Sequence, residues 1–350
     1  MVLNRQDSIS KASHWSPLQL KVGTKPPARW RELLPAPVQL DLGTLTARSL
    51  FDRVQARLLH EPEEVEVAMM ELMSGLWLMR SAPQGAWQDV LAESASHPLA
   101  ALIHQDPFSW RSFHKPRGYA GDAVLIDYIY SRSCRNAEEG EVSPLGERIF
   151  RFNRDTPACA AVRSRRDLVA AVIDEVCTQV DRPQVLSVAC GHLREATLCR
   201  SVIANQAGRF IALDQDKLSL ETVEQSVSGH GVVTVCSSIK ALFRGDVARE
   251  RFDLIYSTGL YDYLDDRIAQ KLTLRLFDML NPGGRLLIAN FLPDIWGAGY
   301  MESFMDWKLI YRTPEQLGSL ISTIAPSDLE ALRLYTEKNQ NIVFLDVMRG

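Results

Sequence analysis

The feature that most constrains the fold is a series of short apolar segments in the C-terminal half of the chain, most of them separated by segments with helical spacing. The apolar segments read as continuous runs, which is typical of strands in a parallel sheet that helices cover on both faces. The last two segments predict a closing antiparallel hairpin. We therefore expect an α/β fold with a mostly parallel sheet of seven strands, at 185–190, 210–214, 232–236, 252–257, 283–291, 331–339 and 340–350.

The N-terminal half has a different pattern. From 45 to 103, apolar residues recur at the spacings of largely buried helices, most clearly in 65–80. The residues before this stretch carry several prolines and show little periodicity. We divide the chain into a loose N-terminal arm at 1–40, a helical domain at 41–155 that we expect to cover a substrate as a lid, and a sheet domain at 156–350.

Composition excludes several classes of protein. The net charge of −4 gives no reason to expect nucleic acid as a partner, because polyanions bind basic surfaces. No apolar run approaches the length of a membrane-spanning helix, about 18 to 20 residues, and the N-terminal residues lack the apolar stretch of a secretory signal. The six cysteines include no C-x-x-C pair, so we expect reduced thiols, no metal site and a cytoplasmic location.

The most informative turn follows the first predicted strand, in VLSVACGHLREA. The strand ends at Cys190, Gly191 makes a tight turn, and we expect a helix to begin near Leu193 with Glu195 in its first turn. Glycine at this point allows a ligand to approach the backbone without a clash with Cβ. In an open α/β sheet such a turn lies at the carboxyl edge, where ligands bind.

The second predicted strand ends at Asp214, at a spacing from Gly191 that suits hydrogen bonds from an acidic side chain to ribose hydroxyls. A dinucleotide is the alternative ligand, but its G-x-G-x-x-G fingerprint lacks its second and third glycines here. Glu195 in the first turn of a helix would repel a phosphate and suit an ammonium group. These residues favour S-adenosylmethionine (SAM), which carries a sulfonium and an ammonium but no phosphate.

Four segments in this order, LSVACG, the strand ending in Asp214, FDLIYS and NPGGRLLIANF, resemble the class I SAM-dependent methyltransferases over about residues 160 to 350. The resemblance implies a Rossmann-like fold and SAM as the cofactor. It implies that Ala189, Cys190 and Gly191 line the methionine part of SAM. It further implies that Asp214 and Gln215 lie at the ribose, Ser238 and Ile239 at the adenine, and Ser257, Thr258 and Gly259 at the methyl group. Apart from the resemblance, Glu195 is a candidate for binding the ammonium of SAM and Arg163 for binding its carboxylate, and the alternative for Arg163 is a solvated arginine on a basic helix face.

A closer resemblance begins upstream, in HKPRGYAGDAVLIDYIY. This G-Y-x-G-D turn, the later AVRSR and CGHLRE segments, and MDWKLIYRT at 305–313 are similar to a bacterial subgroup of methyltransferases for 3-hydroxypalmitic acid methyl ester biosynthesis. Relatives of that subgroup methylate small metabolites, including methionine sulfur. The resemblance covers about residues 105 to 350 and leaves the acceptor open.

On the substrate side, Tyr119 and Asp122 lie in a glycine-punctuated loop that suits a lid, and both are candidate catalytic residues. The alternative for Asp122 is a cap on the following helix. Tyr261 follows the fourth strand, where this fold places residues near the acceptor, and is the third catalytic candidate. The substrate-binding candidates are Tyr128, Tyr130, His192, Asp262, Trp307, Tyr311 and Arg312, although the aromatic residues among them also suit a core.

Methyl transfer is an in-line displacement, so the enzyme mainly aligns the acceptor and excludes water. A carboxylate or thioether acceptor needs no general base, whereas an amine or alcohol needs one, with Asp122 or His192 as candidates. We expect carboxyl O-methylation of a (hydroxy) fatty acid or S-methylation of an amino-acid-like metabolite. N-methylation of a small metabolite and a SAM sensor without turnover are the alternatives, and a homodimer stays open.

Overall fold

The computed structural model describes residues 46–350, except 82–83, 135–139, 228 and 246–250. The predicted arm at 1–40 lies outside the described residues. In the described ranges, no helix combines the length and the apolarity needed to cross a bilayer.

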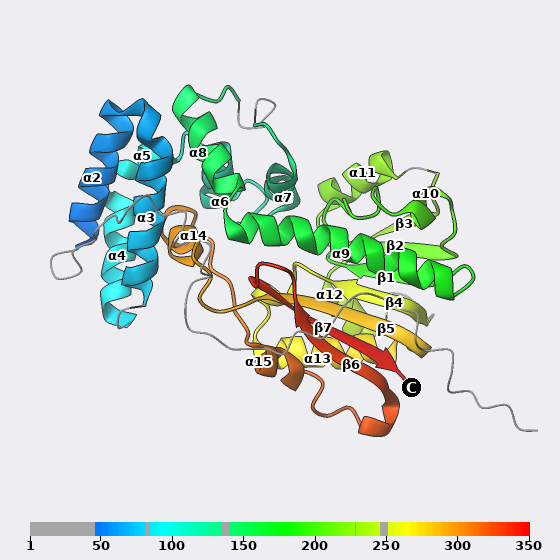
Figure 1. The fold of residues 1–350 in the computed structure, drawn as a ribbon. Helices are drawn as coiled ribbons and strands as arrows, with labels where there is room; N and C mark the ends of the chain where they lie inside the picture. Colours follow the sequence, from blue (N-terminus) through cyan, green and yellow to red (C-terminus); the bar gives the residue numbers. More distant parts are fainter. Residues whose placement is uncertain (1–45, 82–83, 135–139, 228, 246–250) are drawn as a thin grey trace, which may run out of the picture.

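The sheet has seven strands in the order β3-β2-β1-β4-β5-β7-β6, and β7 runs antiparallel to both of its neighbours while the other pairs are parallel. The prediction of a mostly parallel seven-stranded sheet with a closing hairpin is therefore confirmed (Figure 1). The strand order reverses direction between β1 and β4, which is where open α/β sheets bind ligands. The strands are β1 (Gln184–Val188), β2 (Arg209–Asp214), β3 (Val232–Cys236), β4 (Phe252–Ser257), β5 (Leu280–Phe291), β6 (Leu329–Thr336) and β7 (Ile342–Arg349).

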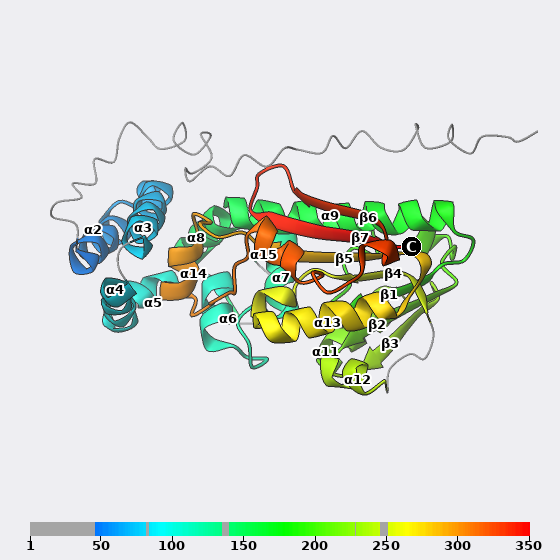
Figure 2. The ribbon, with the colours of Figure 1, turned by 90° about the horizontal axis from the view of Figure 1, so that it is seen from below.

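Helices cover both faces of the sheet, as the continuous apolar strands predict (Figures 1 and 2). Alternate strand residues point to opposite faces, so Leu254 and Leu287 belong to one core and Ile255 and Ile288 to the other. Each core combines one face of the sheet with the helices on that side. The first core holds α9 (Pro157–Gln179), α10 (Arg200–Ile203) and α11 (Lys217–Ser226), and the second holds α12 (Ile239–Arg244), α13 (Asp266–Asp278) and α15 (Pro314–Ser319).

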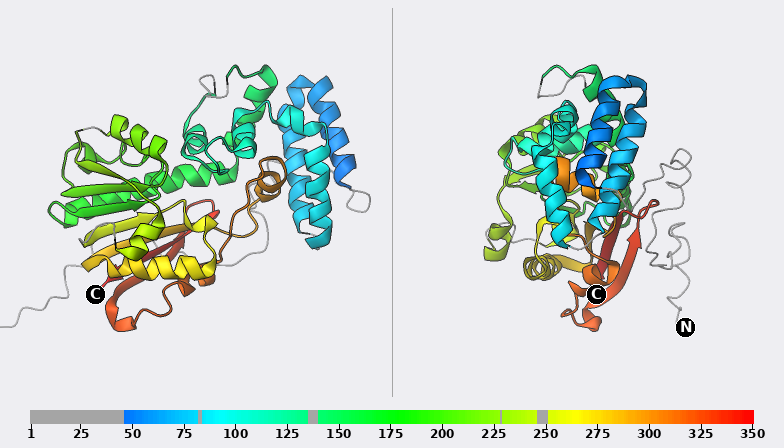
Figure 3. Two further views of the ribbon diagram at one scale, coloured as in Figure 1. Left: turned by 180° about the vertical axis from the view of Figure 1, so that it is seen from behind. Right: turned by 90° about the vertical axis from the view of Figure 1, so that its left-hand side faces the viewer.

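The N-terminal helices form a layer beside the sheet (Figures 1 and 3). A segment from the C-terminal half, α14 (Ala298–Phe304), packs against α3 and α4 and so belongs to this layer. The helical layer is thus built from two separate stretches of chain. Its N-terminal members are α2 (Ala47–His60), α3 (Val65–Arg80), α4 (Gln84–Ser96), α5 (Leu99–Ile103), α6 (Pro107–His114), α7 (Ala123–Tyr130) and α8 (Pro144–Arg154).

The predicted helix after Gly191 is wrong. The segment from Gly191 to Cys199 forms turns, and the short helix α10 begins only at Arg200. The physical reason is a run of left-handed backbone positions, with φ +54° at Gly191 and +49° at Leu193, which a right-handed helix excludes. Glu195 therefore lies in a turn, where no helix dipole acts on it.

Candidate functional site

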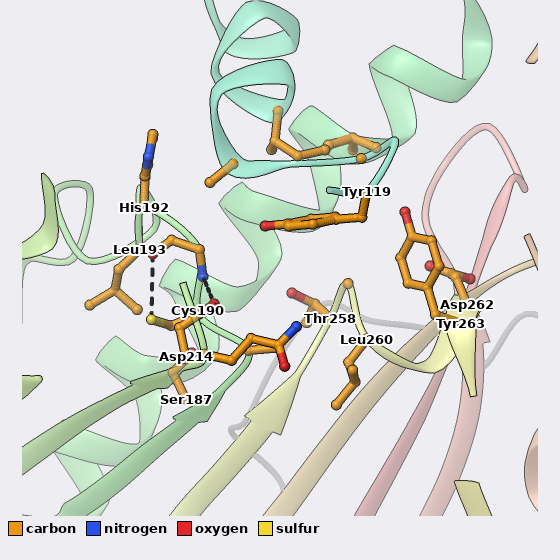
Figure 4. A pocket seen from close by; sticks show the side chains of 18 of the residues that line it. Tyr119, Ser187, Cys190, His192, Leu193, Asp214, Thr258, Leu260, Asp262 and Tyr263 are labelled. Carbon is orange, nitrogen blue, oxygen red and sulfur yellow. Dashed lines mark hydrogen bonds between the residues drawn. The ribbon is translucent and has the colours of Figure 1, made fainter. Parts of the chain in front are cut away.

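A cavity of about 600 Å³ lies at the carboxyl ends of β1, β2 and β4, beneath the turn that precedes α7 (Figure 4). Its volume falls in the range of sites for small ligands, about 300 to 1,000 Å³. One wall is the segment that follows β1, and the opposite wall comes from the turn at 117–121 and from α7 and α9. The cavity therefore occupies the position where the strand order reverses.

The turn after β1 presents its backbone to this cavity. Ala189 and Gly191, both with positive φ, line it together with Cys190, as predicted for the methionine end of the cofactor site. A Cβ at Gly191 would make an ordinary van der Waals contact with the Cβ of Ala123 in α7, at 3.4 Å, so the positive φ and not a lack of space favours glycine here.

Asp214 holds the turn in place from the end of β2. One of its carboxylate oxygens accepts a hydrogen bond from the Gly191 amide at 2.8 Å, and the other accepts one from the Asp216 amide at 2.9 Å. Each carboxylate oxygen has a second lone pair, so the group can still accept hydroxyl protons from a ligand. Burial raises the pKa of Asp214, although these amide contacts favour its charged form.

Glu195 is a half-buried residue whose carboxyl group lines the same cavity. The hydroxyl of Tyr256 donates to it at 2.8 Å, and burial raises the pKa of Glu195. Arg165 of α9 also lines the cavity and donates to the carbonyl oxygen of Thr258. An anionic group and a guanidinium thus line the same cavity, which suits a ligand that carries both an ammonium and a carboxylate.

Arg163 does not line the cavity. Its guanidinium donates to the carbonyl oxygens of Ile129 at 3.2 Å and Arg154 at 2.8 Å, and so ties α9 to the helical layer. Two residues along an α-helix correspond to a rotation of about 200°, so Arg163 and Arg165 point in nearly opposite directions. Arg165, which belongs to the AVRSR motif, lines the cavity instead.

Most of the remaining candidates for the cofactor site line the cavity. Gln215, Ser238 and Ile239 line the cavity beyond Asp214, and Thr258 and Gly259 line it after β4. Ser257 does not, because it is fully buried and its hydroxyl donates to the Val188 carbonyl at 3.0 Å, which links β4 to β1.

Tyr119 extends from the turn before α7 and lies across the cavity from Asp214 and Thr258 (Figure 4). Burial and the negative charge of Asp214 raise the pKa of its hydroxyl, which stays protonated at neutral pH. The position of Tyr119 therefore agrees with a lid residue that donates a hydrogen bond into the cavity.

The expectation that Asp122 faces the acceptor is wrong. Its carboxylate caps α7 by accepting the Leu125 amide at 2.9 Å, and it pairs with the buried Arg111 at 2.8 and 3.0 Å. Asp122 is fully buried and is not among the cavity-lining residues. The alternative interpretation as a helix cap is confirmed.

The wall after β4 uses a different tyrosine from the predicted one. Tyr261 is fully buried and its hydroxyl lies 3.0 Å from that of Thr273, outside the cavity, whereas Tyr263 lines the cavity. The two residues belong to the short 3-10 helix Tyr261–Tyr263, which turns Tyr261 into the core. Sequence reasoning named the Tyr-Asp pair at 261–262 but not the next tyrosine, because helical turns of three residues are not readable from apolar spacing.

Tyr263 meets Trp307 and Gly121 at this wall. The indole nitrogen of Trp307 donates to the Tyr263 hydroxyl at 2.7 Å. A Cβ at Gly121 would overlap that hydroxyl and would lie 2.7 Å from the Trp307 ring, so only glycine fits there. Trp307 lines the cavity as predicted. Tyr263 is 41% exposed as a residue, but desolvation of its hydroxyl raises its pKa.

Asp262 also lines the cavity, as predicted. Its Oδ1 accepts hydrogen bonds from the Phe291 amide at 2.8 Å and the Asn290 side chain at 2.9 Å. Burial raises the pKa of Asp262 to about 6, which is an unusual value for an aspartate and one that suits proton transfer near neutral pH.

His192 and Tyr130 line the cavity on the side of α7. His192 Nδ1 lies 2.8 Å from the carboxylate of Asp127, and Arg194 donates to the same carboxylate. Burial alone would raise the pKa of Asp127, but these two partners hold that pKa below its usual value. Burial raises the pKa of Tyr130 to about 12. Tyr128 does not reach the cavity and packs edge-on against Phe150 in the helical layer.

Tyr311 and Arg312 lie outside the cavity. Arg312 is only 1% exposed and donates to Asn290, Asp266 and the carbonyl oxygen of Tyr261, so it fixes the segment after β4 from behind. Tyr311 packs beneath the Arg80 guanidinium. Within the described part of the chain, no cluster of three or more His, Cys, Asp or Glu side chains has metal-binding geometry.

No protein-family model and no curated protein matches the sequence. Among solved structures, a possible exported protein from Bordetella parapertussis is similar, with a TM-score of 0.53, 16% identity and coverage of 89% of this chain and 99% of that chain. Magnesium protoporphyrin IX methyltransferase from Synechocystis PCC 6803, solved with bound SAH, has a TM-score of 0.45, 11% identity and coverage of 66% and 96%. The N-methyltransferase NodS from Bradyrhizobium japonicum has a TM-score of 0.39, 13% identity and coverage of 53% and 97%. The similarity with the Bordetella protein shows that the two chains share a fold over nearly their whole lengths.

Proposed function

We propose that this chain is a SAM-dependent methyltransferase that acts on a small-molecule acceptor. The observation that carries the proposal is the arrangement of Glu195, Arg165 and Asp214 around the turn at Gly191, inside one cavity at the reversal point of the sheet. This arrangement offers an anion for an ammonium, a cation for a carboxylate and an acceptor for hydroxyl groups.

The residues present fit SAM. Glu195 would hold the ammonium and Arg165 the carboxylate of the methionine part, while Asp214 would accept the ribose hydroxyls. Ser238 and Ile239 line the cavity beyond Asp214 and would flank the adenine. When bound, SAM supplies a methyl group on a positively charged sulfur.

A dinucleotide fits this site less well. Because the turn after β1 does not lead directly into a helix, no helix N-terminus faces the cavity there to attract a pyrophosphate. The carboxylate of Glu195 in the cavity wall would repel its phosphates. The lack of a helix directly after β1 therefore also favours SAM over a dinucleotide.

The other cavity residues would orient the acceptor and exclude water. The hydroxyls of Tyr119 and Tyr263 stay protonated and so act as hydrogen-bond donors. Tyr130 and Trp307 supply apolar surface that shields the transfer from solvent. In-line alignment by these groups would provide most of the rate acceleration.

Carboxyl O-methylation of a (hydroxy) fatty acid or S-methylation of an amino-acid-like metabolite is the acceptor chemistry that we propose, because neither requires a base. N-methylation is the second candidate, and one observation favours it. Asp262 lines the cavity and burial raises its pKa to about 6, so it is the best-placed base for an N–H or O–H acceptor. Asp122 does not serve as this base, because its carboxylate caps α7.

The test is incubation of the full chain with methyl-labelled SAM and a metabolite extract, followed by mass spectrometry of labelled products. We expect a labelled small molecule. An ester that mild base cleaves would show O-methylation, and a fixed-charge cation would show S- or N-methylation. SAH binding without any labelled product would contradict the enzyme and favour a sensor.

A further inference from the structure

The end of the main cavity that lies away from the proposed cofactor site combines aromatic and aliphatic side chains with one carboxylate. Figure 4 places Asp262 and Tyr263 on the side of the cavity opposite to Cys190 and Asp214. We call this part the acceptor end, because a methyl acceptor has to approach from beyond the contacts of the cofactor. Its lining residues are Asp262, Tyr263, Phe291, Trp307 and Leu309.

Asp262 has one carboxylate oxygen that the protein satisfies and one that it leaves free. The residue is 3% exposed, and its Oδ1 accepts hydrogen bonds from the Phe291 amide and the Asn290 side chain. Its Oδ2 accepts no hydrogen bond within the described part of the chain, and neighbouring atoms do not seal it completely. Because Asp262 lines the cavity, this open oxygen is the one that meets the cavity space.

No cationic side chain in the described ranges forms an ion pair with Asp262, although two guanidiniums favour its charged form through longer-range attraction. Arg312 donates to Asn290 and to backbone carbonyl oxygens behind the segment after β4. Arg165 donates to the Thr258 carbonyl oxygen, and in the proposed function it holds the carboxylate of SAM. The acceptor end therefore keeps a negative charge without a directly bonded cation.

This lining distinguishes between the charges that an acceptor can carry. A carboxylate at the acceptor end would approach the Asp262 carboxylate, and the two negative charges would repel each other. An ammonium group would instead donate a charge-assisted hydrogen bond to Oδ2. The faces of aromatic rings such as those of Tyr263 and Trp307 also attract cations. The acceptor end thus favours a cationic group.

An ammonium group bound at Asp262 keeps its proton. Burial raises the pKa of Asp262 to about 6, so the carboxylate is mostly ionised at neutral pH. An alkyl ammonium has a pKa of about 10, so transfer of its proton to Asp262 is uphill by about 4 pKa units. The ion pair is therefore the stable state of these two groups.

We propose that the acceptor carries an ammonium group and that Asp262 Oδ2 binds this group at the acceptor end, beside the rings of Tyr263 and Trp307. The inference rests on the proposed methyltransferase function and narrows its substrate class, because it selects an amino-acid-like metabolite over a fatty acid. An ammonium nitrogen has no lone pair, so the methyl group goes to another atom of the acceptor. A thioether sulfur needs no base for this step: its lone pair forms the new bond to the methyl carbon, the bond from that carbon to the sulfur of SAM breaks with its electrons, and a sulfonium product and SAH result.

The first part of the test uses the labelled product that the unaltered full chain forms from methyl-labelled SAM and a metabolite extract. We expect an acceptor with an amino group on saturated carbon and a new methyl group on a different atom. An analogue with hydrogen in place of that amino group should have a kcat/KM lower by roughly 10- to 100-fold. A natural acceptor without an amino group, methylation of that nitrogen itself, or an equally good analogue would overturn the proposal.

The second part removes the charge of Asp262. Asp262→Asn keeps an Oδ1 acceptor for the Phe291 amide and replaces Oδ2 with a donor. We expect the KM for the acceptor to rise by roughly tenfold or more, while the Kd of SAH measured by calorimetry stays unchanged. The loss should largely disappear for the analogue without the amino group, which a merely structural role of Asp262 would not produce. Asp278→Asn, at an exposed position outside the cavity, is the matched control.

Two outcomes with Asp262→Asn would overturn the proposal. Equal losses for the acceptor and for the analogue would show that Asp262 does not bind the ammonium, and a lower kcat with an unchanged KM would make Asp262 a base. The comparison of acceptor and analogue in the unaltered chain does not depend on how well the variant folds. Failure of the unaltered chain to bind SAH would instead refute the methyltransferase function on which the acceptor end rests.

Discussion

Two arginines on α9 differ in role because of their position on the helix. Arg163 donates to backbone carbonyls of the helical layer, whereas Arg165 lines the cavity. The sequence around them is basic at 163, 165 and 166, so apolar spacing alone does not show which side chain faces the sheet. The choice depends on how α9 is rotated against the helical layer, which is a tertiary property.

At the same scale, we predict that Glu195→Gln removes a pH dependence of SAH binding. Burial raises the pKa of Glu195 above its ordinary value of 4.5, and only the ionised carboxylate attracts the ammonium of the ligand. Affinity should therefore be complete above that raised pKa and should fall as the pH drops through it. Calorimetric titration with SAH across pH 5 to 8 measures the effect.

Asp214 has a raised pKa as well, so a smaller acid limb remains in the Glu195→Gln protein. Glu224→Gln is the control for Glu195→Gln, because Glu224 lies on the outer side of α11 and is not among the cavity-lining residues. Identical pH profiles for Glu195→Gln and the unaltered chain would contradict a role for Glu195 at the ammonium.

The second residue-scale prediction separates stability from catalysis at Asp122. Asp122→Ala removes the carboxylate that accepts hydrogen bonds from the buried Arg111 and removes the cap of α7, so the free energy of unfolding should fall by about 2 to 5 kcal/mol. Denaturant titration measures this loss. In the protein that remains folded, methyl transfer should change by less than about threefold. Asp89→Ala, at an exposed position on α4, is the control. A stable variant without activity would restore Asp122 as a catalytic residue.

At the scale of elements, the strands were predictable and the turns between them were less so. The segments 232–236 and 252–257 match β3 and β4 to the residue. Strand β4 is buried and therefore reads as a continuous apolar run, whereas β3 lies at the edge of the sheet and is recognisable from its β-branched residues. The turn after β1 was misread because its left-handed positions at Ala189 and Leu193 are occupied by residues that rarely adopt them. The return of α14 to the helical layer was equally invisible, since no local pattern records a long-range contact.

A prediction at the scale of elements concerns Gly121, in the turn before α7, which lies against the side chains of Tyr263 and Trp307. Gly121→Ala would push the Tyr263 hydroxyl and the Trp307 ring apart, and so would displace the lid turn from the segment after β4. Because misplacement by about 1 Å can cost 100-fold in rate, we expect kcat to fall by tenfold or more. Affinity for SAH should change little, since Glu195 and Asp214 are untouched. Steady-state kinetics measures kcat and calorimetry measures the affinity for SAH, with Gly318→Ala as the control. An unchanged kcat would contradict the role of Gly121 in placing the lid turn.

At the scale of the molecule, the helical layer closes the cavity through ties to the sheet domain. Arg117 of the lid turn donates to Asp216 at 2.9 Å and to Ser219 at 3.2 Å, just beyond β2. His192 after β1 pairs with Asp127 of α7. A ligand at Asp214 is therefore enclosed by contacts between two parts of the chain that lie far apart in sequence (Figures 1 and 4).

Removal of one tie should accelerate release of the ligand. Arg117→Ala breaks a partly buried ion pair worth roughly 1 kcal/mol, so we predict about fivefold faster dissociation of SAH. Stopped-flow tryptophan fluorescence follows the dissociation, and the effect should shrink at high salt. Arg48→Ala, whose ion pair with Glu93 is exposed, is the control. A rate equal to that of the unaltered chain would show that this tie does not hold the lid.

Calorimetric titration of the full chain with SAH tests the central claim most directly. We predict saturable one-to-one binding that Asp214→Ala weakens at least about tenfold, because the ribose hydroxyls and the Gly191 turn both lose their acceptor. Gln340→Ala, at an exposed turn far from the cavity, should bind like the unaltered chain. Absence of SAH binding, or equal binding by the Asp214→Ala protein, would contradict a SAM site at the carboxyl edge of this sheet.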